Sequence, residues 1–307
     1  MLHYIFNRFL QAIFVLLLMT VVVFLLARAG GDPLETMLPE QATEQQKKEL
    51  AVRLGLEKPL YEQYWMWIKL VARGDLGTSM LEPYPVIELV KATAPKTLML
   101  VSYAMFFALI FGIPLGVMAG VNRGLAVDTI AKTLAILGQS APAFWIALVT
   151  MYFFAIKWHI FPVLGSTDLL GAVLPSFALG AFLTAGITRL TRSAMIEAME
   201  SDYITLARAK GLSDAVVIFK HALKNASLPV VTYAAMYFAI CLSGVVVVEV
   251  VFAWPGIGLL TFRAALGGDF AVLQGTVLLL TAAVVLANLI VDVAYAYIDP
   301  RIRYRKA

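Results

Sequence analysis

Residues 9–27 read FLQAIFVLLLMTVVVFLLA, a run of 19 residues without Asp, Glu, Lys or Arg. A helix needs about 20 apolar residues to cross the hydrocarbon core of a bilayer. Five further stretches are long and apolar enough to do the same, although several contain Pro or Gly. The sequence therefore predicts an all-α integral membrane protein with six transmembrane helices. They are expected at about residues 9–27, 94–121, 130–156, 172–188, 228–252 and 271–298.

The composition supports this class. Hydrophobic residues make up 61% of the 307-residue chain and charged residues 14%, whereas soluble domains have roughly 45–50% and about 25%. Too few charges are present to cover a water-facing surface, which excludes a soluble globular enzyme, and the apolar excess excludes a disordered chain. Cys241 is the single cysteine. An intrachain disulfide and a cage of thiolate metal ligands are therefore excluded as well.

The first stretch has two interpretations. Arg8, the apolar run and Ala27-Arg28-Ala29 could form a signal peptide with a small-x-small cleavage site. The run is long for the apolar core of a signal peptide, which favours a retained transmembrane helix.

The orientation follows from Lys and Arg, which gather on the cytoplasmic side of membrane proteins. With both termini in the cytoplasm, 13 of the 24 Lys and Arg residues lie on the shorter, inner segments. This divides the chain into an N-terminal transmembrane helix at residues 1–29, an extracytoplasmic segment at 30–93 and a five-helix core at 94–307. Within the core, residues 189–227 face the cytoplasm.

The extracytoplasmic segment predicts two short helices. Thr43 and Gln46 have the spacing of a capping box before a helix at residues 45–53, and a second helix is expected at 61–72. The segment could form a small lobe or a lid. The simpler interpretation is a connector that rests on the bilayer, with Trp65 and Trp67 as interfacial anchors.

The cytoplasmic segment contains the most informative sequence, SDYITLARAKGLSDAVVIFKHALKNASLP at residues 201–229. Ser201 or Asp202 can cap a first short helix, and Gly211 suits the left-handed residue after its end. Ser213 can cap a second helix, and Pro229 is expected to open the next span. Such a helix between two spans could dock on a cytoplasmic partner or rest on anionic lipid as a basic amphipathic helix.

At these residues the chain resembles an ABC-importer permease, and more closely the first permease subunit of the dipeptide, oligopeptide and nickel uptake family. The general cytoplasmic motif of such permeases, Glu-Ala-Ala-x3-Gly-x9-Ile-x-Leu-Pro, is matched at Ala207, Gly211 and Leu223. Thr205 and Lys224 depart from its Glu and Pro. The version found in the peptide branch is closer. Its residues here, which the resemblance assigns to coupling with an ATPase, are Asp202, Tyr203, Ala207, Arg208, Ala209, Lys210, Gly211, Leu212, His221, Leu223 and Asn225.

The resemblance extends along nearly the whole chain, through Gly31-Asp32-Pro33, residues 74–77, residues 252–258 and the tail at 299–303. It implies the type I importer fold in a bacterial or archaeal cytoplasmic membrane. It also implies a second permease, two cytoplasmic ATPases that bind ATP and Mg, and an extracytoplasmic binding protein. The expected solutes are short peptides. Nickel chelates, glutathione and oligosaccharides are alternatives in the same family.

The sequence itself predicts no catalysis, no cofactor, no metal site and no nucleic-acid partner. It lacks the Gly-x4-Gly-Lys-Ser/Thr loop that cradles nucleotide phosphates, so ATP would be hydrolysed by a partner. None of His3, His159 and His221 lies in the middle of a span, which disfavours an intramembrane enzyme. An ion-coupled secondary transporter remains as an alternative. Such proteins are expected to carry mid-membrane acids and repeated, discontinuous helices.

Ionisable residues in or beside the spans are further candidates. Asp292, with Asn288 one turn earlier, could line or gate a pathway. It could also make an interhelical hydrogen bond near the cytoplasmic end, with Arg301 or Arg303 neutralising the charge; we favour this second interpretation. On the outer side, Glu249, Trp254 and Arg263 are candidates for contact with a binding protein. A solvated charge is an equal alternative for Glu249 and Arg263.

Overall fold

The computed structural model describes residues 2–29, 42–163 and 168–298. Within those ranges every regular element is a helix, apart from one isolated bridge between Thr78 and Pro85. The chain divides into two compact units, Met1–Thr97 with Pro255–Ala307, and Leu98–Trp254. Among the described residues, five helices are long and apolar enough to cross a membrane, and a bent pair could supply a sixth crossing. The predicted all-helical membrane architecture is confirmed.

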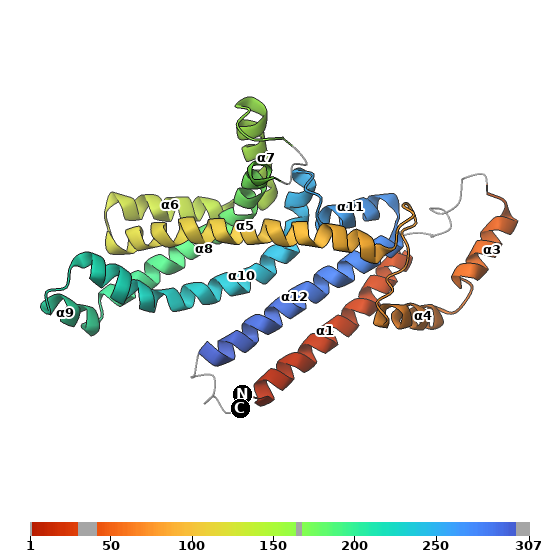
Figure 1. Ribbon diagram of the computed structural model, residues 1–307, viewed down its shortest axis with the longest axis horizontal. Coiled ribbons are helices and arrows are strands. Elements are labelled where there is room, and N and C mark those ends of the chain that lie inside the picture. Colours follow the sequence, from red (N-terminus) through yellow and green to blue (C-terminus); the bar gives the residue numbers. More distant parts are fainter. Residues whose placement is uncertain (1, 30–41, 164–167, 299–307) are drawn as a thin grey trace. The chain divides into compact units, whose positions relative to one another are not determined.

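The first unit is built on two long helices. α1 (Leu2–Ala29) and α12 (Phe270–Ile298) run side by side (Figure 1). The short helix α11 (Ile257–Gly267) packs on α12, and α4 (Leu60–Ala72) contacts α1. The first turns of α5 (Val86–Val121) join α11 and α12 in a common apolar core.

The predicted helices of the extracytoplasmic segment are confirmed as α3 (Glu44–Leu54) and α4. Thr43 and Gln46 form the expected capping box. The ring of Trp67 packs against Phe24 on α1, with the two ring centroids 5.9 Å apart, and the interpretation of both tryptophans as interfacial anchors stays a prediction. Trp65 is 59% exposed. The Thr20 and Tyr64 hydroxyls are 2.9 Å apart, so polar and aromatic contacts together fix α4 on α1.

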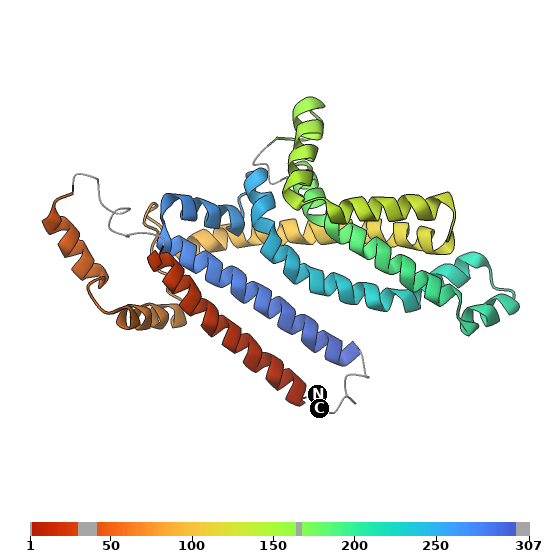
Figure 2. The ribbon, with the colours of Figure 1, turned by 180° about the vertical axis from the view of Figure 1, so that it is seen from behind.

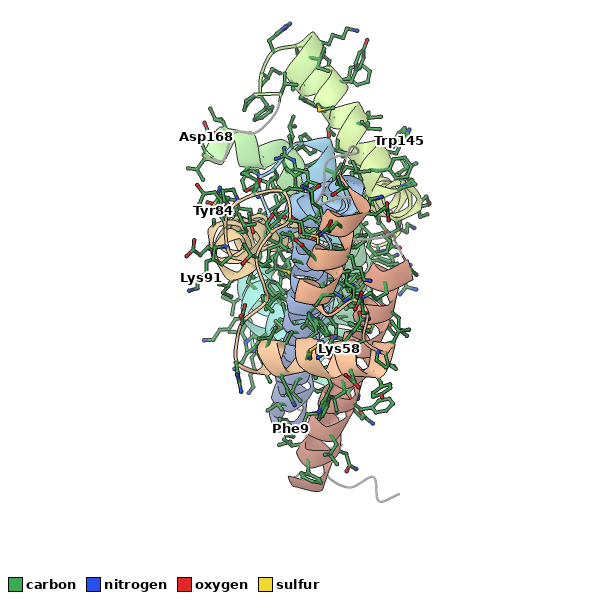
Figure 3. All side chains as sticks on the ribbon, turned by 90° about the vertical axis from the view of Figure 1, so that its right-hand side faces the viewer. Phe9, Lys58, Tyr84, Lys91, Trp145 and Asp168 are labelled. Carbon is green, nitrogen blue, oxygen red and sulfur yellow. The ribbon has the colours of Figure 1, made fainter. Side chains whose placement is uncertain are left out.

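The loop that follows α4 is fastened to the start of α12. Asp269 is buried, and its carboxylate accepts hydrogen bonds from the Ser79 hydroxyl and from the backbone N–H of Met80. The same side chain accepts from the N–H of Val272 in the first turn of α12. Tyr84, labelled in Figure 3, is half-exposed at the end of this loop.

The stretch expected to cross the membrane at residues 130–156 is not one continuous helix. α6 (Ala126–Ser140) is followed by α7 (Ala143–Thr150) and the π-helix η1 (Met151–Lys157), with a bend of 105° between the two parts. α6 packs on α8, and Figure 2 shows α7 turning away from the direction of α6. The bend follows Pro142, which lacks a backbone donor and holds Ala141 in an extended conformation with ψ 128°. Trp145, labelled in Figure 3, is half-exposed on α7.

The second unit is held together by close packing of helices. α8 (Leu169–Met199) lies against α5, α6 and α10 (Leu223–Val251). Gly112, Gly116 and Gly120 of α5 meet Ile187, Thr191 and Met195 of α8. Both sets have a four-residue spacing, which places each on one helix face. Small residues at this spacing let helix backbones approach closely in a membrane.

This packing predicts a strong effect of one methyl group. In Gly116→Ala the new Cβ would lie 2.7 Å from the Thr188 carbonyl oxygen, a backbone atom that cannot turn aside. We expect the variant to lose about 1–3 kcal/mol of stability through overpacking. Gly244→Ala is the matched control, because a Cβ there meets no atom within 4 Å. Thermal unfolding in detergent measures both, and equal melting temperatures would contradict this account of the packing.

The cytoplasmic segment differs from its predicted form. α8 continues to Met199, so the helix extends well past the apolar stretch. Only α9 (Asp202–Ala209) is a separate short helix. The second predicted helix runs without interruption from the π-helix η2 (Val216–Ala222) into α10, and Pro229 lies inside α10. The expectation that Pro229 opens a new span is therefore wrong. Prolines are tolerated in membrane helices where neighbouring groups satisfy the freed carbonyl.

Candidate functional site

The turn after α9 has the predicted backbone conformation. Gly211 has φ 76°, in the left-handed region. Its N–H donates to the Arg208 carbonyl at 2.9 Å, and the Leu212 N–H donates to the Ala207 carbonyl at 3.4 Å. These bonds close the end of the helix. Capping by the Ser201 side chain is not observed, because its hydroxyl donates back to the Ala198 carbonyl instead.

Two residues of α9 fix the helix to its own unit. Ile204 and Ala207 are buried in a cluster with Val117, Met195 and Val217. α9 is amphipathic, and these two positions are three residues apart on its inner face. Ala207, one of the predicted coupling residues, is therefore an anchor of α9 and does not reach the surface.

The other predicted coupling residues fall into two groups. Seven are exposed on α9 and the turn after it; these are Asp202, Tyr203, Arg208, Ala209, Lys210, Gly211 and Leu212. His221 and Leu223 are half-buried further along, and Asn225 is exposed. The structure thus brings the first group together at the tip of the segment and places the second group on the adjoining helix.

Sequence reasoning missed one residue of this tip. Leu206 lies between the predicted positions and is 56% exposed. Leu206 follows Tyr203 by three residues, so the two share a face of α9. That spacing was a signal in the sequence. Together they give the tip an apolar patch beside the Arg208 and Lys210 cations.

A buried ion cluster between α6 and α8 was also missed. Asp128 is fully buried, and its carboxylate accepts bonds from Arg192 at 2.5 and 3.0 Å. Lys132 lies 3.3 Å from the same carboxylate, and the Gly124 N–H donates to it at 2.9 Å. Asp128 and Lys132 are four residues apart, which is the only part of this cluster that the sequence could have indicated.

Asp292 has an ion partner on α1. The Arg8 guanidinium lies 3.3 Å from its carboxylate. Asn288 and Gln11 join them around a cavity of about 230 Å³. This contact favours the interhelical interpretation of Asp292. Arg301 and Arg303, the partners expected from the sequence, lie outside the described residues.

The three candidates for contact with a binding protein differ in exposure. Glu249 and Trp254 are 0% and 1% exposed. The expectation of a solvated Glu249 is therefore wrong, and neither side chain presents a surface to another protein in this structure. The burial of Glu249 and Trp254 could not be predicted from the sequence, because burial at the end of a helix depends on tertiary packing. Arg263, on α11, is exposed.

The described part of the chain contains no cluster of three or more His, Cys, Asp or Glu side chains that could hold a metal ion.

Two protein-family models match the sequence, one in its N-terminal part and one in the remainder. Residues 112–304 match the family model described as binding-protein-dependent transport system inner membrane component. Residues 1–100 match the model of the N-terminal part of such membrane components. The first model alone covers more than half of the chain.

Curated relatives match along the full length. The chain is 39% identical over 306 residues to the glutathione transport system permease protein GsiC of Salmonella choleraesuis (strain SC-B67). It is 37% identical over 333 residues to the dipeptide transport system permease protein DppB of Alkalihalophilus pseudofirmus. Each alignment covers 99% of this chain and 100% of the relative.

A solved structure shares the fold. A chain of the MetNI methionine ABC transporter in an inward-facing conformation superposes with a TM-score of 0.58 and 20% identity. The match covers 69% of this chain and 97% of the other.

Proposed function

Because the chain belongs to the family of binding-protein-dependent transport system inner membrane components, we propose that it carries short peptides through a pathway formed with a second permease. As a permease of an ABC importer of the peptide, dipeptide and glutathione family, it is a non-catalytic, multi-pass component of an inner membrane transporter with the type I fold. The relatives compared above are bacterial.

The proposed assembly has four kinds of subunit. This chain and the second permease form the pathway, two cytoplasmic ATPases bind ATP and Mg, and an extracytoplasmic binding protein delivers the solute. The chain lacks a nucleotide-binding loop of its own, which supports a division of labour with ATPase partners. Arg263, the one exposed member of the three outer candidates, is proposed to face the binding protein.

The observation that carries the proposal is the exposed tip at α9. Ile204 and Ala207 fix α9 to its unit while Tyr203, Leu206 and Lys210 remain exposed. A helix held on one face and free on the other can insert into a groove of an ATPase and transmit its closure. Such docking couples two sites only if its contacts differ between the open and closed states. His221, Leu223 and Asn225 are proposed to support the tip from the adjoining helix.

The solute class follows from what the relatives share. One relative is named for glutathione and another for dipeptides, and both solutes are short peptides. Glutathione is the second candidate, because the relative named for it is 39% identical over the whole chain.

The assembly is tested by purifying the tagged chain from native membranes in mild detergent and identifying the subunits that accompany it. Recovery of a second permease with two ATPases is expected, together with ATP-dependent uptake of labelled dipeptide into vesicles that contain the binding protein. Recovery of the chain alone, with uptake driven by an ion gradient in vesicles without ATP, would instead identify a secondary transporter.

Asp292→Asn provides a sharper test against ion coupling. Because Asp292 pairs with Arg8 between α1 and α12, and both side chains are partly exposed, we expect a loss of no more than about 1 kcal/mol in stability. Because a loss of this size leaves nearly all of the protein folded, uptake should fall by no more than about twofold. Its pH profile should not change. A shifted or flattened profile would place Asp292 in a proton or cation path.

A further inference from the structure

A cavity of about 370 Å³ lies between α6 and α8. Lys132, Arg189 and Arg192 supply three cationic groups at its wall. Ala131, Ala135 and Ile136 supply apolar surface beside them. The cavity therefore combines a cationic part with an apolar part, which is the pattern that an anionic amphipathic molecule requires.

The cations exceed the acids around this cavity. Asp128 is shared by Arg192 and Lys132, at 2.5 Å and 3.3 Å. Arg189 is exposed, and no carboxylate among the described residues pairs with it. One carboxylate thus faces three cations, so a bound phosphate would find two unmatched positive charges. The Thr188 hydroxyl already donates to the Thr184 carbonyl, and Gln139 adds an amide deeper along α6.

The order of residues along the helices gives the cavity a direction. Arg192 and Asp128 lie toward the cytoplasmic ends of α8 and α6, where the distribution of Lys and Arg places the inner membrane surface. Ile136 and Leu137 follow further into α6 and are 65% and 60% exposed. The cationic part is thus at the level of the inner headgroups, with exposed apolar surface leading from it toward the bilayer core.

We propose that this cavity binds an anionic phospholipid of the cytoplasmic leaflet. Its phosphate lies against Lys132, Arg189 and Arg192, and an acyl chain lies along Ile136 and Leu137. The apolar part of the cavity distinguishes a lipid from free phosphate, which would use only the cationic part. Anionic lipids in this leaflet are attracted by basic groups between helices.

The test is a binding titration of the full-length chain in detergent by native mass spectrometry. The probes are phosphatidylglycerol and, as the uncharged comparison, phosphatidylcholine. Each basic group beside an anionic lipid contributes roughly fivefold in affinity. Lys132→Gln with Arg189→Gln should therefore weaken the binding of phosphatidylglycerol about 25-fold and leave that of phosphatidylcholine unchanged.

A matched control removes two charges elsewhere on the cytoplasmic side. Arg123→Gln with Lys220→Gln has the same change in net charge, and both side chains are exposed outside the cavity. We expect less than about a threefold loss in this control, below the roughly fivefold effect of one basic group at the lipid. An equal loss in both double variants would show general surface attraction and overturn the proposal.

Two further measurements keep the proposal falsifiable. Arg189→Gln alone removes no ion pair seen in the described residues, so it should fold normally and weaken phosphatidylglycerol binding about fivefold. Unchanged binding in this variant would overturn the proposal.

Inorganic phosphate or a dipeptide should not displace the lipid at equal concentration. Displacement by phosphate would identify a site for free anions, and displacement by dipeptide would identify a site for the transported solute.

Discussion

Replacing Asp128 by Asn is expected to lower the free energy of unfolding by about 3–5 kcal/mol. The carboxylate is fully buried and is held by Arg192, Lys132 and the Gly124 N–H. Asn keeps a similar shape but removes the charge, which leaves the Arg192 guanidinium without its counter-ion. Since Arg192 is mostly buried, water cannot replace the lost partner fully. Thermal unfolding in detergent, followed by circular dichroism, measures the loss.

Glu200→Gln is the matched control for this prediction. It breaks the Arg123–Glu200 pair, whose atoms are 2.6 Å apart and whose side chains are 61% and 67% exposed. An exposed pair contributes no more than about 1 kcal/mol. Comparable losses in Asp128→Asn and Glu200→Gln would show that burial does not decide the strength of these contacts.

A double variant separates two effects, the loss of the Asp128–Arg192 ion pair and the cost of leaving a buried charge without a partner. Asp128→Leu with Arg192→Met replaces both buried partners by apolar side chains. Replacing a whole buried ion pair in this way is often neutral or stabilising, whereas removal of one partner is costly. The double variant should therefore recover most of the stability lost in Asp128→Asn. Failure to recover it would mean that the cluster stabilises α6 on α8 by a net attraction.

The spans could be predicted because their signal is local. A continuous apolar run over about 20 residues has few alternatives to a membrane helix, and each of the five long helices includes one predicted stretch. Their ends could not be predicted from the apolar run. α8 continues through Arg189 and Arg192 to Met199. Once a helix has formed, adding a further residue is easy even where that residue is polar.

The prolines show that a local sequence pattern does not predict where a helix bends. Pro175 and Pro229 lie inside α8 and α10, while Pro142 marks a bend of 105°. All three lack the backbone donor, so the residue type alone does not separate them. A local pattern therefore does not predict which proline interrupts its helix.

In the candidate site, too, local features could be predicted from the sequence and contacts between distant residues could not. The left-handed conformation at Gly211 was predictable, since it depends on the end of one short helix. The pairing of Arg8 with Asp292 and of Asp128 with Arg192 was not, because these partners are far apart in the chain and meet only after the helices pack. The burial of Glu249 depends on packing as well.

Gly211→Val is expected to reduce uptake by at least about fivefold while the protein remains in the membrane at its usual level. Gly211 has φ 76°, and a Cβ there meets no atom within 4 Å. The substitution therefore causes no collision and acts through the backbone. A β-branched residue in the left-handed region costs roughly 1–3 kcal/mol, and 1.4 kcal/mol corresponds to a tenfold change in population. The strain is relieved by a different turn, which reorients the tip of α9.

Two further variants test whether the loss arises from coupling. Asn tolerates the left-handed region, so Gly211→Asn should keep most of the uptake. Gly74→Val introduces the same strain in another turn, since Gly74 has φ 80° and open space around its Cβ. If Gly74→Val reduces uptake as much as Gly211→Val, general strain explains the loss. Backbone strain alone would affect both turns equally. If only Gly211→Val reduces uptake, and ATP hydrolysis by the assembled complex no longer responds to solute, then the tip of α9 transmits the ATPase cycle.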